Sequence, residues 1–254
     1  MAQTPLVSVL IVNFHSDDKV KSLKDSLKGS GVPFECIVED NSRHNKGFGC
    51  ATNAASKQAR GKYLFICNPD VIASKTTLEE LLIASRRLEN RAAIAPQLQN
   101  ENGIPYLSTT TRLGWLQLVI AHSILNKIWR NNPVSKDFWG DCYSLNESRF
   151  VGNASGAALF MPTYMFKSVN GFDERFFLYF EDNDLCNRLI DSGFKIWYAA
   201  NVHVIHEQHG TTTNKTEAMN FFRKSRWIYS YKTFGLLPSL ISEAWLRLWE
   251  LAKS

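Results

Sequence analysis

The sequence predicts an α/β protein with a mostly parallel, doubly wound central sheet flanked by helices. Short apolar runs rich in β-branched residues alternate along the chain with segments whose apolar residues recur at helical spacing. The 254 residues are enough to bury a substantial core. With 44% hydrophobic and 21% charged residues, the composition is that of an ordinary soluble domain, which argues against a disordered chain or a coiled coil.

The first half of the chain follows this alternation regularly. Strands are expected at residues 6–14, 33–39, 62–67 and 92–98, and helices after residue 17 and at residues 47–59 and 76–88. Glu79 and Glu80 stand in the first turn of the last of these helices, where negative charge is favourable. Ser74 or Thr76 is expected to cap the same helix.

The second half begins with an irregular stretch, residues 100–150, apart from an apolar segment at 113–129. Order then returns, with a strand at 156–161, a helix at 164–169, a helix at 181–192 that ends at Gly193, and a strand at 194–205. The chain is helical in pattern from Thr216 onward, with breaks near Gly235 and Pro238. No internal repeat and no low-complexity linker divides the chain, so one main domain is expected.

The net charge of +5 is compatible with a nucleic acid, an anionic membrane surface or a phosphorylated substrate. Because the basic residues are dispersed and acids follow the predicted strands, we expect no nucleic-acid partner. The five cysteines are odd in number and contain no CxxC pair, which favours a reducing compartment over a disulfide framework or a zinc site. The first apolar run is too short for a signal peptide or a membrane span, so a cytoplasmic protein is expected.

Polar residues follow the second and third predicted strands. Asp40-Asn41-Ser42 ends one and Asn68-Pro69-Asp70 ends the other. Ligands of open α/β sheets bind at the carboxyl ends of strands, where Asp40 could accept hydrogen bonds from a ribose or a base. Both triplets are also ordinary turn formers. No dinucleotide fingerprint or P-loop is present, although Gly47 and Gly49 at a helix start would allow a backbone to approach phosphate.

Three acids, Glu181, Asp182 and Asp184, open the helix at 181–192. The five residues before them are almost wholly apolar, so a carboxylate here would be partly desolvated and would bind protons more tightly, as a general base must. Simple helix capping is the alternative. Asp184 and Arg188 are expected to pair at i, i+4 on the outer face, whereas Asp182 points to the inward side and is the better catalytic candidate.

Three histidines, His203, His206 and His209, lie at the end of the strand at 194–205 or just beyond it. His206 is expected to reach the same sheet edge as Asp70. These two side chains could hold a divalent cation whose shell is completed by nucleotide phosphate oxygens. A hydrogen-bonded structural histidine is the alternative.

Six motifs, in this order and at this spacing, resemble glycosyltransferase family 2 of the GT-A fold, and above all its bacterial rhamnosyltransferases. They are residues 7–14, 40–42, 47–53, 68–70, 171–177 and 181–186, within a resemblance that covers about residues 6–234. The resemblance implies a Rossmann-like sheet and inverting transfer of a sugar to a glycan hydroxyl. L-Rhamnose from dTDP-L-rhamnose is the implied donor, with a UDP-sugar as the alternative, and a lipid-linked acceptor in surface polysaccharide or O-antigen synthesis is implied.

The resemblance also implies roles for individual residues. Those implied at the donor are Asn13, Phe14, Asp40, Gly47, Asn53, Asn68 and Asp70, with Asp40 at the nucleoside. Asp182 matches the general base and Glu181 its neighbour, while Asp70 and His206 match the ligands of Mg²⁺ or Mn²⁺. Asn68 replaces the first acid of the family's Asp-x-Asp motif, which removes one charge from the cation site, and His209 could substitute for His206.

On this reading residues 1–235 form a GT-A catalytic domain, with a donor half at about 1–99 and an acceptor half at about 100–235. Residues 236–254 form an amphipathic helix with Leu240, Ile241, Trp245, Leu248 and Trp249 along one face. A basic, aromatic stretch at 221–232 precedes it, which suits peripheral attachment to the cytoplasmic face of the inner membrane. Packing on its own domain or on a second subunit in a homodimer is the alternative.

Two functions of another class compete with sugar transfer. A nucleotidyltransferase would need a glycine-rich, basic loop after the first strand to hold a triphosphate, but residues 14–18 are acidic. A non-catalytic nucleotide-binding protein is the second alternative.

Overall fold

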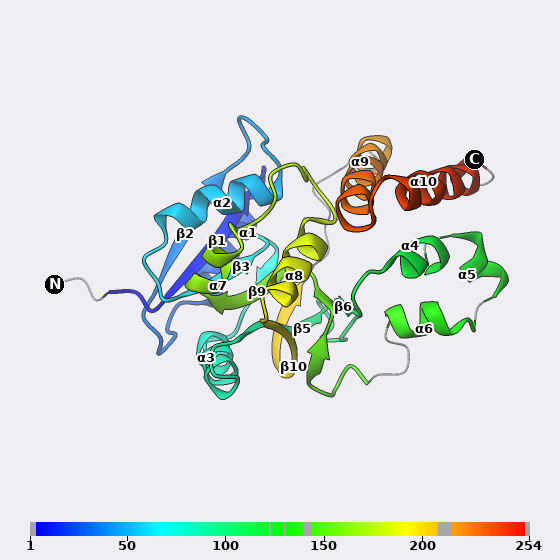
Figure 1. The fold of residues 1–254 in the computed structure, drawn as a ribbon. Helices are drawn as coiled ribbons and strands as arrows, with labels where there is room; N and C mark the ends of the chain where they lie inside the picture. The colour runs from blue at the N-terminus through cyan, green and yellow to red at the C-terminus, as the bar shows by residue number, and fades with distance from the viewer. Residues whose placement is uncertain (1–3, 122, 130, 140–143, 208–214, 252–254) are drawn as a thin grey trace.

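The computed structural model describes residues 4–121, 123–129, 131–139, 144–207 and 215–251, and its centre is a mixed eight-stranded sheet (Figure 1). The main strand order is β2-β1-β3-β9-β5-β10-β4, and β7 also pairs with β10. The parallel strands are β1 (Val7–Asn13), β2 (Phe34–Asp40), β3 (Tyr63–Cys67), β5 (Ala92–Gln99) and β10 (Lys195–His206). The antiparallel ones are β4 (Val71–Ile72), β7 (Arg149–Val151) and β9 (Ala158–Pro162). The predicted mostly parallel sheet is confirmed.

Helices cover both faces of this sheet. Its central strands are therefore buried on both sides. Alternate residues of β1 belong to different core clusters, Val9 with one and Leu10 with the other. The first cluster includes α1 (Asp17–Ser26) and α3 (Thr77–Arg87), and the second includes α2 (Phe48–Gln58), α7 (Thr163–Ser168) and α8 (Glu181–Asp191). These elements agree with the predicted ones to within about two residues at most ends. Thr76 is the N-cap residue of α3, but its side chain makes no capping hydrogen bond.

The stretch predicted to be irregular folds into short elements beside the main sheet. It contains β6 (Thr109–Thr110), which pairs with β8 (Asn153–Ala154), and the helices α4 (Trp115–Ala121), α5 (Ile124–Ile128) and α6 (Pro133–Trp139). Together with α9 (Lys215–Phe234) and α10 (Leu236–Leu251) these helices form the right-hand part of the view in Figure 1. A third apolar cluster, which includes Leu118, Phe180, Tyr229 and Leu246, joins them to the start of α8. Within the described residues, no helix has the length and apolarity that a membrane crossing requires.

The last helix packs on its own chain. Gly235, with φ of +82°, separates α9 from α10 as predicted, whereas Pro238 lies in the first turn of α10, where proline is tolerated. The indole nitrogen of Trp115 on α4 donates to the carbonyl oxygen of Pro238 at 3.0 Å. The single apolar face predicted for this helix is wrong, because Trp245 packs inward while Leu240 remains exposed.

A buried ion cluster joins α9 to α10. The guanidinium of Arg226, 3% exposed, lies 2.8 Å from a carboxylate oxygen of Glu250 and 3.0 Å from one of Glu243. Both acids have a second partner, Arg223 for Glu250 and Arg247 for Glu243, each at 2.7 Å. The α9–α10 hairpin is thus held by charge as well as by apolar contact.

Replacing Arg226 with Ala is expected to lower the free energy of unfolding by about 2 kcal/mol. This is less than the roughly 3–5 kcal/mol of an isolated buried pair, because Arg223 and Arg247 still reach the two acids. Arg247→Ala is the matched control, since it removes an exposed partner of the same Glu243 and should cost under about 1 kcal/mol. Urea denaturation measures both, and equal losses would contradict the buried cluster.

Candidate active site

The carboxyl ends of β1 and β2 lie side by side. Asn13 and Asp40 are register partners, and the amide of Asn41 donates to the carbonyl of Asn13 at 2.8 Å. The Asn13 side chain is buried and donates to Asp17 at 2.7 Å, which fixes the start of α1. Asp40 is exposed, and hydrogen bonds from Ser42 lower the pKa of its carboxyl. Asp40 is therefore a solvent-facing carboxylate at the edge where a nucleoside is predicted, with Phe14 half-buried beside Asn13.

Gly47 and Asn53 hold the loop that precedes α8. Gly47 has φ of +84°, and a Cβ added there would lie 2.3 Å from the carbonyl oxygen of Phe177. Asn53 is buried and donates to the Phe172 carbonyl at 2.9 Å and to the Glu174 carboxylate at 3.0 Å. Its own oxygen accepts from the Phe172 amide at 2.9 Å. Gly47 and Asn53 thus both contact the segment at residues 172–177. They do so beside the region that is predicted to bind the donor.

Asn68, Asp70 and His206 meet just beyond the end of β3. The Nε2 atom of His206 lies 3.3 Å from Oδ1 of Asp70 and 3.3 Å from Nδ2 of Asn68. Burial acts to raise the pKa of Asp70, but the hydrogen bond and charge of His206 outweigh it and lower the pKa, so Asp70 is a carboxylate. The Tyr106 hydroxyl bonds to Nδ1 of the same imidazole.

The side chains of Asp70 and His206 suit a divalent cation whose coordination shell is completed by phosphate oxygens. Mg²⁺ prefers ligands at about 2.1 Å in octahedral geometry, so adjacent ligands are about 3 Å apart, close to the 3.3 Å between Asp70 and His206. A neutral imidazole that donates from Nδ1 to Tyr106 would present its Nε2 lone pair to a metal, in place of the present contact of Nε2 with Asp70. Across the described parts of the chain, no group of three or more His, Cys, Asp and Glu residues could hold a metal by itself. A cation here would therefore rely on ligand oxygens.

Sequence reasoning did not single out Tyr106. It lies in the stretch without periodicity, and its main chain is brought to the sheet by a bond from its amide to the Leu98 carbonyl at 3.1 Å. Its contact with His206, a hundred residues away in the sequence, identifies it. His203 is exposed and does not join the group, and His209 lies outside the described residues.

The acid pair follows a strained turn. Tyr179 and Phe180 both have positive φ, +71° and +64°, a left-handed conformation that costs roughly 1–3 kcal/mol for each non-glycine residue. Aromatic packing holds the turn, because Phe180 lies against Phe222 and Tyr229. The turn places Glu181 in the interior, where one oxygen of its carboxyl group, Oε2, has no hydrogen-bond partner.

The two acids of the pair have different surroundings. Burial, with the charge of Asp182 adding to it, raises the pKa of Glu181 to about 8. Asp182 is partly exposed and accepts from the Asn183 amide at 2.8 Å and from the Gly156 amide at 3.3 Å. Burial raises its pKa as well, although these hydrogen bonds favour the charged form. The negative charge of the pair therefore lies mainly on Asp182, the more accessible of the two, while the buried Glu181 keeps its proton.

The start of β9 joins the acid pair to the cation candidates. The Gly156 amide donates to Asp182, and the next residue, Ala157, accepts from the Asn68 amide at 2.9 Å. Cys67 at the end of β3 is in register with Ala158. Asp182 and the group of Asn68, Asp70 and His206 thus lie at one edge of the sheet.

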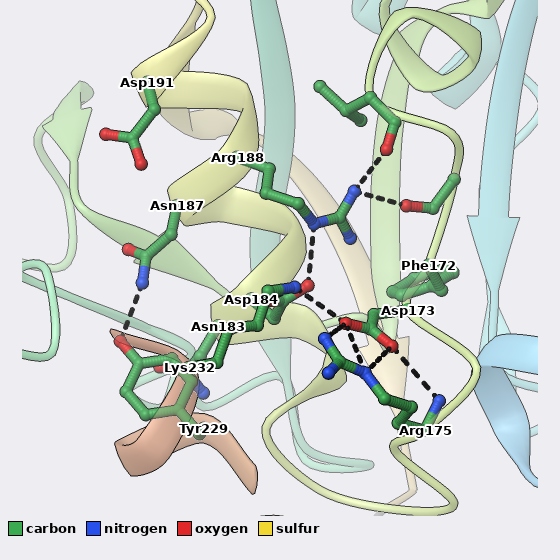
Figure 2. A network of polar contacts seen from close by, with 12 residues as sticks. Phe172, Asp173, Arg175, Asn183, Asp184, Asn187, Arg188, Asp191, Tyr229 and Lys232 are labelled. Atoms are coloured by element: carbon green, nitrogen blue, oxygen red, sulfur yellow. Dashed lines mark hydrogen bonds and ion pairs between the residues drawn. The ribbon is translucent and has the colours of Figure 1, made fainter. Parts of the chain in front are cut away.

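The predicted pair of Asp184 and Arg188 forms, at 2.7 Å, but it is not on an outer face (Figure 2). Asp184 is 3% exposed, because α9 and the turn at 170–173 cover this side of α8. Lys232 of α9 reaches both Asp184 at 2.5 Å and Asp173 at 2.7 Å. Arg188 also donates to the carbonyls of Val169 and Gly171. This network fixes α8, and with it the acid pair, against its neighbours.

Stability should fall as pH rises across the titration of Glu181. Between the ordinary value near 4.5 and the folded pKa of about 8, the folded chain keeps a proton that the unfolded chain releases. The contribution of neutral Glu181 is full below about pH 4.5 and is lost as pH rises through about 8, by at most roughly 1.4 kcal/mol per pH unit.

Glu181→Gln should remove this fall when urea denaturation is repeated across the pH range. Glu79→Gln is the matched control, since Glu79 is an exposed acid in the first turn of α3, and it should keep the wild-type slope. Identical slopes in wild type and Glu181→Gln would contradict a protonated Glu181.

Comparison with known proteins agrees with this geometry. Residues 143–210, which include β9, α8 and β10, match the family model of the N-terminal domain of galactosyltransferase. The chain is 28% identical to the N-acetylglucosaminyl-diphospho-decaprenol L-rhamnosyltransferase of Mycobacterium tuberculosis over 73% of this chain, and it spans only 64% of that relative's length. It is 25% identical to the rhamnosyltransferase WbbL of Escherichia coli, covering 87% of this chain and 89% of that one.

A solved structure shares the fold. The mannosyltransferase PcManGT of Pyrobaculum calidifontis, in complex with GDP-Man and Mn²⁺, superposes with a TM-score of 0.58 at 12% identity, covering 97% of this chain and 71% of the other. Such a likeness concerns the arrangement of helices and strands. In fold the chain is thus similar to a solved GT-A glycosyltransferase, and in sequence it is similar to glycosyltransferases that include two rhamnosyltransferases.

Proposed function

We propose that this chain is an inverting glycosyltransferase that moves L-rhamnose from dTDP-L-rhamnose to a hydroxyl of a lipid-linked glycan in surface polysaccharide or O-antigen synthesis. The names of two rhamnosyltransferase relatives support the sugar. The decaprenol-linked substrate in the name of the mycobacterial relative supports a lipid-linked acceptor. The partner molecules would then be a nucleotide-sugar donor and this acceptor.

One observation carries the proposal. Gly156 and Ala157 hydrogen-bond the Asp182 carboxylate on one side and the Asn68 main chain on the other. A proton acceptor and a polar group suited to a diphosphate therefore lie next to each other, as a transfer between a sugar hydroxyl and a nucleotide sugar requires. A module that only binds nucleotide has no need of the first of these groups.

In the proposed reaction, an acceptor oxygen forms a bond to the anomeric carbon while the bond from that carbon to the diphosphate breaks. An alcohol is a poor nucleophile because its pKa is near that of water, about 15.7. Asp182 takes the hydroxyl proton as the attack proceeds, a contribution of typically about 10²–10⁴-fold. The raised pKa of Asp182 favours its acting as proton acceptor. Attack from the side opposite the leaving diphosphate inverts the configuration.

Asp70 and His206 would hold a divalent cation, Mg²⁺ or Mn²⁺. When bound, such a cation supplies positive charge to the departing diphosphate. The presence of Mn²⁺ and GDP-Man in the PcManGT structure supports this proposal. Asp40 and Asn13 would lie at the nucleoside, and the Gly47 turn would border the donor.

Asp182→Asn should lower sugar transfer by about 10²–10⁴-fold and leave donor binding nearly unchanged, because the amide has the same shape but cannot take the proton. The assay measures release of nucleoside diphosphate from dTDP-L-rhamnose and from UDP-sugars. Asp191→Asn is the control, since Asp191 is an exposed acid at the other end of α8.

The same assay separates the competing functions. Wild-type turnover by Asp182→Asn would exclude this residue as the base. Release of nucleoside diphosphate from UDP-sugars but not from dTDP-L-rhamnose would show that the donor is a UDP-sugar. Pyrophosphate release from a nucleoside triphosphate would indicate a nucleotidyltransferase, and binding without turnover would indicate a nucleotide-binding protein.

Asp70→Asn should weaken binding of dTDP at least tenfold in the presence of Mn²⁺ and much less in a chelator, because the substitution removes the charge that faces the cation. Titration calorimetry measures the four affinities. Asp25→Asn, at an exposed acid near the end of α1, should behave like wild type. An unchanged dTDP affinity in Asp70→Asn would remove Asp70 from the site.

A further inference from the structure

The outward face of α10 is apolar. Leu236, Leu237, Leu240, Ile241 and Leu248 are each exposed over at least half of their surface. Four of them, from Leu237 to Leu248, recur at spacings that put them on one side of a helix. We refer to these five residues as the α10 apolar face. Single exposed apolar residues are common on soluble proteins, but a group along one helix marks a binding surface.

The inward face of the same helix combines polar side chains with the apolar side chains of Trp245 and Leu246. The Ser239 and Ser242 side chains are buried and lie 2.9 Å and 3.3 Å from the hydroxyl of Ser230 on α9. Glu243 and Glu250 bind the buried Arg226. A surface helix ordinarily turns its apolar side to the core and its polar side to water. α10 follows this order on its inner side, where Leu246 is buried, but it departs from it on the outside, where leucines face water.

Elements that contact α10 also expose large apolar side chains. Leu116 of α4 adjoins Trp115, whose indole binds the first turn of α10. Ile128 and Trp129 at the end of α5 are 75% and 55% exposed, and the ammonium of the neighbouring Lys127 lies 5.6 Å from the ring centre of Trp249 on α10. The helical unit formed by α4, α5, α6, α9 and α10, within residues 113–139 and 215–251, is thus the part of the described chain in which exposed apolar residues concentrate.

The same unit carries the net charge. Residues 113–139 and 215–251 contain nine basic and four acidic residues, whereas the rest of the chain contains twenty of each. The full +5 of the protein therefore falls on these two segments. Arg226 is buried between Glu243 and Glu250, and Lys232 pairs with Asp173 and Asp184, so the exposed positive charges are those of residues such as Lys127, Lys136 and Lys224. Exposed lysines together with exposed leucine and tryptophan side chains match the interface of an anionic bilayer, which offers negative headgroups above an apolar layer.

We propose that the α10 apolar face docks on the surface of an anionic phospholipid bilayer. A symmetric contact between two copies would bring two positively charged units together, which costs energy, whereas anionic lipid complements them. The proposal rests on the proposed function for its purpose, because a lipid-linked acceptor would be presented at that surface. The docking itself follows from the apolar face and the charge.

Flotation of the full chain with lipid vesicles tests the proposal. Wild type is expected to bind vesicles that contain phosphatidylglycerol at least tenfold more tightly than vesicles of phosphatidylcholine alone, and added salt should weaken this binding. The double variant Leu240→Gln/Ile241→Gln should lose at least tenfold in binding to the anionic vesicles. Its thermal unfolding should be unchanged, because both side chains are exposed.

The matched control is Ile83→Gln/Ile104→Gln, which alters two exposed isoleucines outside the helical unit, and it should bind like wild type. Equal binding by the α10 variant and wild type would overturn the proposal, and so would binding without preference for anionic lipid. A wild-type dimer in sedimentation that the α10 substitutions dissociate would assign the face to a second copy instead. Sugar transfer to a soluble acceptor is assayed separately, so a chain that docks without transferring sugar would refute only the proposed function.

Discussion

The site depends on the direction of one strand. β9 runs antiparallel to β3 and β5, so its beginning lies where those strands end. The amide of Gly156 and the carbonyl of Ala157 are thereby available at the ligand edge, before the ladder with β3 begins at Ala158. A parallel strand in the same position would bring its other end to this edge. The antiparallel insertion therefore brings together α8 and the Asn68–Asp70 turn, which are more than a hundred residues apart in sequence.

Local patterns predicted most of the fold. The β-branched run that became β1 and the helical spacing of Leu185 and Leu189 in α8 depend on neighbours in the chain, and both elements formed as expected. The antiparallel direction of β9 depends on partners far along the sequence, so no local pattern reveals it. The same reason explains the errors. Asp184 was assigned to an outer face because only its own helix could be considered, whereas Lys232 of α9 covers it.

The sequence predicted most residues of the candidate site, but it did not predict which side chains contact them. Asp70 and His206 were expected at one edge, and they lie 3.3 Å apart there, yet Tyr106, which orients the imidazole, carried no signal. For the acid pair, the sequence did not predict which carboxyl group is buried. The sequence predicted that Asp182 points to the inward side of its helix, which is wrong, because Glu181 is buried and Asp182 is partly exposed. The helix follows a left-handed turn at Tyr179 and Phe180, a conformation that sequence does not favour.

Lys232 links the two C-terminal helices to the helix that carries the acid pair. It lies near the end of α9, two residues before the last one, and its ammonium holds Asp184 on the helix that begins with the acid pair. The adjoining hairpin partner α10 is in turn locked to α9 by Arg226. Two ion-paired contacts, Lys232 with Asp184 and Arg226 with Glu243 and Glu250, thus form a continuous path from the last helix to the helix that begins with Glu181 and Asp182.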